Sequence, residues 1–233
     1  MRIGEDYPKI EWEILGMELL EPNALIGDTI LATIAFVFFY RTRRFYRENR
    51  NDYNLYWSYF FLVFGIGFFI GGLGHVFYNY TGVSGKFSGW YLGIFSTLSI
   101  ELAMASQLLL KKSLLKKSII VKAIVALIAL SLIIIFADIS KNPNRGMIVP
   151  TINSLIGLLF ALGFLGYKYS KIKSQHFKYL YWSVIILLPS VAFQGLKINI
   201  SPWLDRNDLS HILLIFALFL YYKSLKKVQK IIT

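Results

Sequence analysis

One histidine stands inside an otherwise apolar run at residues 66–80, "IGFFIGGLGHVFYNY", where His75 is the side chain best suited to bind a metal or move a proton. A second histidine, His211, follows Asp208 by three residues and Asn207 by four, so these side chains share one face of a helix. Two imidazoles, a carboxylate and a water are enough to hold a catalytic zinc ion. The pattern therefore predicts a zinc site of His75, His211 and Asp208. Taken singly, each residue has a simpler interpretation as an interfacial histidine or a charge at a helix start.

Two carboxylates fall within apolar runs, where inserting an ionisable group into hydrocarbon costs about 2.5–3.5 kcal/mol. Glu101 lies near the middle of its run and must be protonated, paired or exposed to water. Asp28 lies about one turn inside its run. Each is predicted as a general base. Four further residues at the same end of the predicted helices are expected to contact a substrate: Trp90, Asn153, Gln194 and Asn207.

The stretch "GMELLEPNALIGDTIL" places the oxygen donors Glu21, Asn23 and Asp28 around a proline. Carboxylate and amide oxygens are the ligands that a hard cation such as calcium prefers. The alternative is a loop that only caps the following helix, with Asn23 as the N-cap residue. Both interpretations remain open on the sequence alone.

The chain is too apolar for a soluble domain, with 233 residues of which 56% are hydrophobic. Seven stretches are long enough to cross a bilayer, and they fall at 24–40, 57–78, 88–110, 119–138, 147–167, 178–196 and 208–223. We therefore expect an all-α, polytopic seven-transmembrane helix bundle, a single domain over 1–233. Residues 1–22 lack the features of a signal peptide and are expected to remain outside the membrane as an interfacial amphipathic helix. Residues 223–233 form a basic cytoplasmic tail.

Basic residues gather in alternate connections. Of the 25 Lys and Arg residues, 18 lie in segments 41–52, 111–122, 168–178 and 223–230. The positive-inside rule then puts the N-terminus outside and the C-terminus in the cytoplasm, which requires an odd number of spans. The net charge of +12 does not indicate nucleic-acid binding, because these segments lack an RNA-recognition motif. Cysteine is absent, which excludes disulfides and thiolate metal sites.

The N-outside seven-span pattern, the Glu-Pro-Asn before the first span, and the histidines late in span two and early in span seven resemble a superfamily of seven-span membrane hydrolases. This superfamily includes the alkaline ceramidases and the adiponectin-receptor-like proteins. The resemblance implies zinc ligation by His75 and His211, and calcium ligation by Glu21 and Asn23, with Asp28 as a further carboxylate there. The sequence departs from the family pattern in three places: Asn207 replaces a histidine, Gly71 replaces a serine, and the third span carries Glu101 in place of an aspartate.

These features predict a zinc-dependent hydrolase that acts on a lipid amide or ester from an outward-facing site. The alternative is a non-catalytic protein that binds or senses a membrane lipid, because the departures at Asn207 and Gly71 would disable a standard zinc site. A transporter that uses Glu101 is disfavoured by the lack of a second matching half. A retinal protein is disfavoured because the seventh span has no mid-membrane lysine. Short connections suit a prokaryotic plasma membrane, and the oligomeric state is left open.

Overall fold

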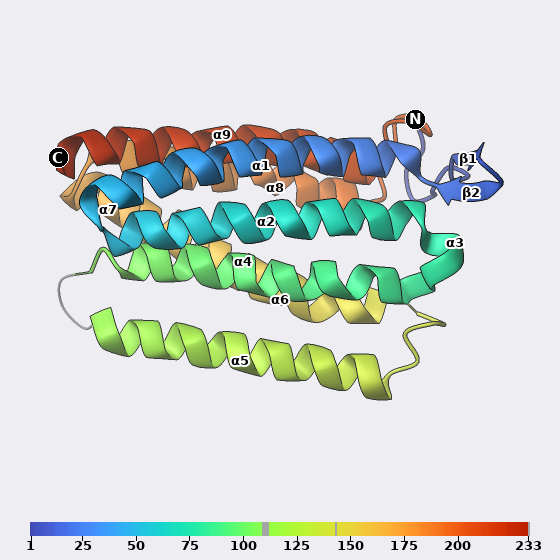
Figure 1. Cartoon of the computed structure of the whole chain (residues 1–233), viewed down its shortest axis with the longest axis horizontal. Coiled ribbons are helices and arrows are strands. Elements are labelled where there is room, and N and C mark those ends of the chain that lie inside the picture. Colours follow the sequence, from blue (N-terminus) through green and yellow to red (C-terminus); the bar gives the residue numbers. More distant parts are fainter. Residues whose placement is uncertain (109–111, 143, 233) are drawn as a thin grey trace.

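Long apolar helices run side by side along one axis, as the computed structural model shows for residues 1–108, 112–142 and 144–232 (Figure 1). The longer helices are α1 (Pro22–Asn49), α2 (Asp52–Val76), α4 (Phe87–Ala105), α5 (Lys112–Phe136), α6 (Asn144–Leu158), α8 (Lys178–Gly195) and α9 (Arg206–Ile232). Shorter helical segments are α3 (Tyr78–Thr81), η1 (Gly82–Lys86), the π-helical η2 (Leu159–Leu165), α7 (Gly166–Ile172) and η3 (Gln175–Phe177). A small hairpin, β1 (Glu11–Ile14) and β2 (Met17–Leu20), precedes α1.

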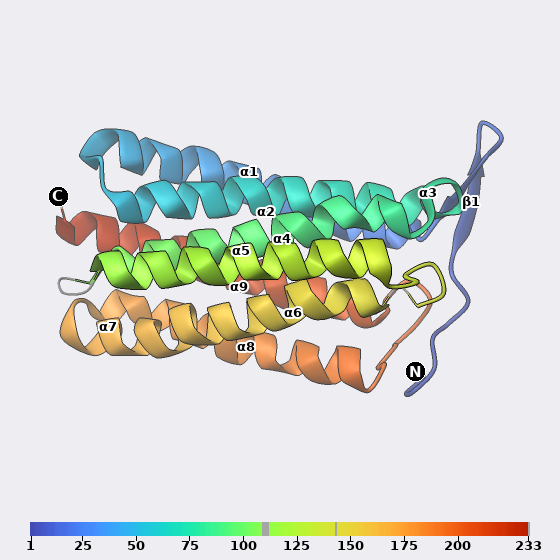
Figure 2. The same cartoon turned by 90° about the horizontal axis from the view of Figure 1, so that it is seen from below.

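Six helical segments in the described residues are long and apolar enough to cross a membrane. They are α1, α2, α5, the continuous run from α6 to α7, the run from η3 to α8, and α9. The chain is therefore a helical, multi-pass membrane protein. The remaining predicted span, residues 88–110, corresponds to α4, which lies beside α2 and α6 and is not one of these six segments (Figures 1 and 2).

The two ends of the bundle differ, and Figure 1 shows the N-terminus and the C-terminus at opposite ends. We call the end that carries β1 and β2 the hairpin end, and the opposite end the C-terminal end. An aromatic core fills the bundle toward the C-terminal end, where Trp57, Tyr53 and Phe61 are almost completely buried. Phe38 of α1 stacks on Tyr222 of α9 in the same core. This packing fills the bundle interior toward the C-terminal end.

The N-terminal segment differs from the helix that the sequence led us to expect. Residues 11–20 form an antiparallel hairpin in which Glu11 pairs with Leu20 and Ile14 with Met17. Its two turn residues, Leu15 and Gly16, both have positive φ, as a tight type I′ turn requires. The alternation of charged and apolar residues in "EWEI" has the two-residue period of a strand, and this pattern outweighs the helical prediction.

The ends of several helices also differ from the ends of the apolar runs that predicted them. Helix α1 continues through the arginines to Asn49, and α9 continues through most of the basic tail, because Lys and Arg are good helix formers. Arg50 ends α1 in a left-handed conformation, and the side chain of Asn51 caps α2. Lys122, which we counted with a basic connection, lies inside α5. The predicted end of the third span at residue 110 lies outside the described residues.

Candidate functional site

A cavity of about 920 Å³ occupies the centre of the bundle. Helices α1, α2, α4, α6 and α9 line it, and residues 6–10 together with the α8–α9 connection cover it at the hairpin end. Along α2 the lining extends from His75 down to Phe60, which is about 22 Å at 1.5 Å per helical residue. Eight residues chosen from the sequence line this cavity: Glu21, Asn23, Asp28, His75, Trp90, Gln194, Asn207 and His211.

The first polar group in the cavity joins α2 to the start of α1. His75 Nδ1 lies 2.8 Å from Glu21 Oε2, and Lys9 Nζ lies 3.1 Å from the same oxygen. Burial by itself would raise the pKa of Glu21, but the hydrogen bonds and charges of His75 and Lys9 outweigh it and lower the pKa to about 2. Glu21 is therefore a carboxylate that holds the N-terminal segment against α2.

The second polar group joins α1 to α9. His211 Nε2 lies 3.5 Å from Asp28 Oδ1, and Asp28 is only 4% exposed. Glycines let these side chains approach: a Cβ added at Gly72 would lie 3.3 Å from Asp28 Oδ2, and one at Gly27 would lie 3.1 Å from His211 Nδ1. At Gly71, where the family resemblance implies a serine, an added Cβ would lie 3.8 Å from the same Asp28 oxygen. The glycines of α2 thus make room for the Asp28 carboxylate.

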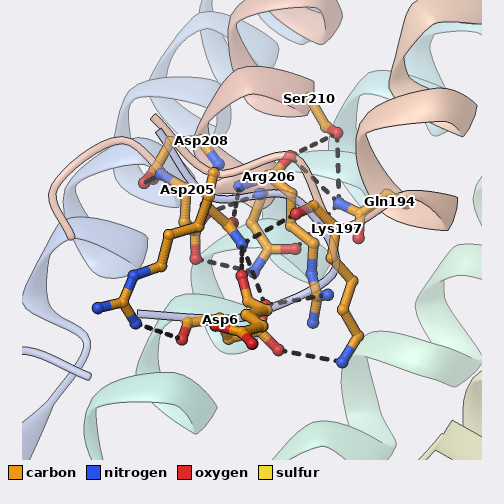
Figure 3. A network of polar contacts seen from close by, with 11 residues as sticks. Asp6, Gln194, Lys197, Asp205, Arg206, Asp208 and Ser210 are labelled. Carbon is orange, nitrogen blue, oxygen red and sulfur yellow. Dashed lines mark hydrogen bonds and ion pairs between the residues drawn. The ribbon is translucent and has the colours of Figure 1, made fainter. Parts of the chain in front are cut away.

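Asp208 belongs to the start of α9 and not to the lining of the cavity. Its Oδ2 accepts hydrogen bonds from the backbone N–H of Asp205 and from Asn23 Nδ2, each at 3.0 Å. Asp205 in turn accepts from the backbone N–H groups of Asn207 and Asp208. This reciprocal pattern is a capping box, in which Asp205 is the cap and Asp208 its partner. Figure 3 shows these aspartates beside the ion pairs of Asp6 with Lys197 and Arg206.

Glu101, predicted as a general base, does not line the cavity. Its side chain is 3% exposed and lies between α4 and α5, where Lys122 Nζ is 2.8 Å from Oε1 and 2.7 Å from Oε2. Asn153, predicted to contact substrate, is also buried away from the cavity lining, with its amide unpaired. The sequence required Glu101 to be protonated, paired or exposed to water, and the structure pairs it with Lys122, which lies ten residues, almost three helical turns, after the start of α5.

The remaining predicted contacts lie at the mouth of the cavity. Gln194 Nε2 donates to Asn207 Oδ1 at 3.0 Å and to Ser210 Oγ at 3.3 Å, linking α8 to α9 (Figure 3). Trp90 packs against Gly146 of α6, where an added Cβ would overlap its ring. Asn23, which was the alternative N-cap of α1, instead lies in the first turn after Pro22, and the cap position is Glu21.

The predicted ligands are arranged in pairs. Among the residues that the structure describes, no group of three or more His, Cys, Asp or Glu side chains is placed to hold a metal ion. Glu21 is held by His75 and Lys9, and Asp208 is held by Asn23 and the backbone of Asp205. As arranged, these side chains do not match a zinc or calcium centre. We therefore assign no reaction step to a metal, and both metal sites stay predictions.

Sequence reasoning missed the aromatic lining below the histidines. Phe60, Phe64 and Phe68 recur every four residues on α2, with ring centroids 5.3 Å and 4.3 Å apart along the series. Phe68 meets the ring of His211 edge-on at 5.6 Å. This helical period was visible in the sequence and indicates a shared face. At the mouth, Lys86 lies over the Tyr78 ring, and burial lowers the pKa of its ammonium group.

Comparison with known proteins places the chain in one family. Residues 24–230 match the profile described as "Family of unknown function (DUF6962)". The chain belongs to this family. The matched residues include every helix that lines the cavity, from the first turn of α1 almost to the end of α9. No curated protein and no solved structure matches the chain.

Replacing Glu21 by glutamine should lower the free energy of unfolding and make it depend less on pH in the acidic range. The pKa of Glu21 is lowered from 4.5 to about 2, so its contribution is complete above about pH 4.5 and is lost as the pH falls toward 2. At pH 7 we expect Glu21→Gln to reduce stability by about 1.5–3 kcal/mol, the typical value for a hydrogen bond to a charged group. Thermal unfolding followed by circular dichroism between pH 3 and 7 measures both effects. Glu11→Gln, in the exposed hairpin, serves as the control. Parallel pH profiles for the wild type and Glu21→Gln would contradict the prediction.

Proposed function

We propose that this protein spans the membrane seven times, with its hairpin end outside and its C-terminal end in the cytoplasm. Helix α4, with 19 residues, is about 28 Å long, close to the hydrocarbon thickness of a bilayer. Its polar residues Ser96, Thr97 and Glu101 are buried within the bundle, so they need not face lipid. The basic residues at the end of α1, at the start of α5, in α7 and at the end of α9 gather toward the C-terminal end, which supports the orientation.

We further propose that the central cavity binds an amphipathic membrane lipid without necessarily cleaving it. The observation that carries this proposal is the polarity gradient of one continuous cavity. Near the hairpin end its walls carry His75, Glu21 and Asp28, and deeper it is lined by Phe60, Phe64 and Leu158. A polar group would meet hydrogen-bonding partners at the first level, and a hydrocarbon chain would contact aromatic rings at the second.

The amount of lipid that co-purifies with the protein tests the proposal. We compare one variant that fills the cavity with one that does not. Gly93 lines the cavity, and a Cβ added there meets no atom within 4 Å, so Gly93→Phe should project into the cavity without an initial clash. Gly163 also has open space around an added Cβ but does not line the cavity, which makes Gly163→Phe the matched control.

We expect lipid to be extracted from the detergent-purified wild type and from Gly163→Phe, and at least tenfold less from Gly93→Phe. Mass spectrometry of the organic extract, normalised to protein, measures the ratio. A wild type without bound lipid, or a Gly93→Phe variant that retains the full amount, would show that the proposal is wrong.

The second proposal is a metal-dependent hydrolase that acts on the lipid amide or ester. It is favoured by two histidine–carboxylate pairs, His75 with Glu21 and His211 with Asp28, which face one cavity. A metal would require these pairs to rearrange, because each carboxylate now lies against a histidine. Elemental analysis of the wild type and His211→Ala tests the proposal: about one zinc per chain that is lost in the variant supports it, and no zinc in either contradicts it.

A further inference from the structure

A second pocket, of about 420 Å³, lies between α6 and α8, and none of the histidines or carboxylates of the polar site lines it. Its walls are almost entirely apolar, and Leu155 of α6 and Val191 of α8 are 50% and 61% exposed. In a membrane-spanning bundle, such half-exposed apolar side chains face lipid. Figure 2 shows the ribbons of α6 and α8 running together near α7 and separating toward the hairpin end. The pocket therefore lies on the lipid-facing side of the bundle and extends along α6 from Met147 to Leu158.

The pocket adjoins the central cavity. Seven residues line both spaces: Gly89, Trp90, Met147, Ser154, Leu158, Leu214 and Tyr221. The main contacts of α8 are with α9 and with the π-helical segment η2, so its half nearest the hairpin end is not packed tightly on α6. Each of the two helices also carries an internal proline, Pro150 in α6 and Pro189 in α8, and proline bends helices away from straight packing.

The cavity has one polar mouth and one apolar branch of its own, and the adjoining pocket forms a second apolar branch beside it. One branch descends between α2 and α9 along Phe60, Phe64 and Phe68, and the other leads sideways between α6 and α8. Residues 6–10 cover the mouth, held by Asp6 with Lys197 and Arg206 (Figure 3). An occupant that reaches both branches must carry two hydrocarbon chains joined near one polar group.

We propose that the pocket between α6 and α8 holds the second hydrocarbon chain of a two-chain lipid whose polar group lies beside His75 and His211. This inference rests on the proposed lipid binding and names the chemical class of the ligand. The lateral branch is open to the bilayer, so the lipid reaches the site from within the membrane, while the N-terminal segment covers the aqueous side.

Filling the lateral pocket from both walls tests the inference. Thr151 and Ser190 line it from α6 and α8, and the double variant Thr151→Phe/Ser190→Phe places two rings in the space of the second chain. Ile152 follows Thr151 by one residue and Ala192 follows Ser190 by two; both are exposed and line neither space. The control is therefore Ile152→Phe/Ala192→Phe.

Each purified protein is delipidated, mixed with vesicles of total membrane lipid from the expression host, isolated again and extracted. Mass spectrometry then separates single-chain from two-chain lipids. We expect the wild type and the control to retain two-chain lipid, and the filled variant to retain at least fivefold less of it while single-chain lipid is not reduced.

The outcomes separate the two proposals. A wild type that retains only single-chain lipid, or a filled variant that retains two-chain lipid in full, overturns the two-chain assignment but leaves lipid binding intact. Loss of both classes from the filled variant also overturns the assignment, because the two branches would then be a single site. A wild type that retains no lipid at all overturns the proposed function itself.

Discussion

Replacing Lys122 by methionine is expected to destabilise the protein by about 3–5 kcal/mol, because the change leaves the Glu101 carboxylate buried without its counter-ion. Glu101 is 3% exposed, and Lys122 Nζ is within 2.8 Å of both of its oxygens. Helix α6 also packs closely here: a Cβ added at Gly157 would lie 3.1 Å from Glu101 Cδ. The carboxylate therefore has little freedom to turn toward water.

A rescue variant separates loss of the ion pair from a general defect in folding. Adding Glu101→Gln to Lys122→Met removes the unpaired charge and should restore most of the lost stability, since replacing both partners of a buried pair is often nearly neutral. Lys117→Met, at an exposed lysine of the same helix, should change stability by less than about 0.5 kcal/mol. Denaturant titration in detergent measures all four proteins. Equal effects of Lys122→Met and Lys117→Met would refute the role of the pair.

Replacing Gly74 by alanine should cost about 1–3 kcal/mol or more, although alanine is normally favoured in a helix. A Cβ added at Gly74 would overlap the backbone carbonyl of Gly85 in η1, and a backbone atom cannot rotate away as a side chain does. Relief requires the end of α2 to move away from η1. Because His75 is the next residue, the same movement should lengthen its contact with Glu21.

Gly93→Ala provides the matched comparison, because Gly93 is also helical and its added methyl group meets no atom within 4 Å. This variant should be as stable as the wild type, or more stable by up to about 1 kcal/mol, from the higher helix propensity of alanine. Unfolding midpoints measured by circular dichroism compare the two. A Gly74→Ala variant as stable as Gly93→Ala would show that α2 and η1 are not closely packed.

Several features of the site followed from local sequence. The apolar runs predicted the helices, because only a helix satisfies its backbone within lipid. Polar residues near the same helix ends predicted a shared polar region, and eight of the chosen residues do line one cavity. Two further patterns were visible in the sequence but did not enter the predictions. The four-residue period of Phe60, Phe64 and Phe68 indicates the cavity wall, and the alternation in "EWEI" indicates the hairpin.

Other features depended on partners distant in sequence. The sequence left Glu101 protonated, paired or exposed to water, and only the packing of α5 against α4 shows that it is paired with Lys122. Asp208 had the residue type of a metal ligand, yet its carboxylate is used by Asp205 and Asn23 in the start of α9. Spacing along one helix cannot reveal such competition, because hydrogen-bond partners are chosen among all the groups within reach.

The sequence alone determined that this chain crosses a membrane repeatedly and that His75, His211 and Asp28 lie toward the end opposite the basic segments, because hydropathy and charge are local properties that the bilayer selects. The tertiary structure decided how the histidines and carboxylates are paired and where the apolar branches run. These depend on close approaches at Gly27, Gly72 and Gly146 and on the divergence of α6 from α8. Such distances arise from the packing of separate helices, which no local pattern encodes.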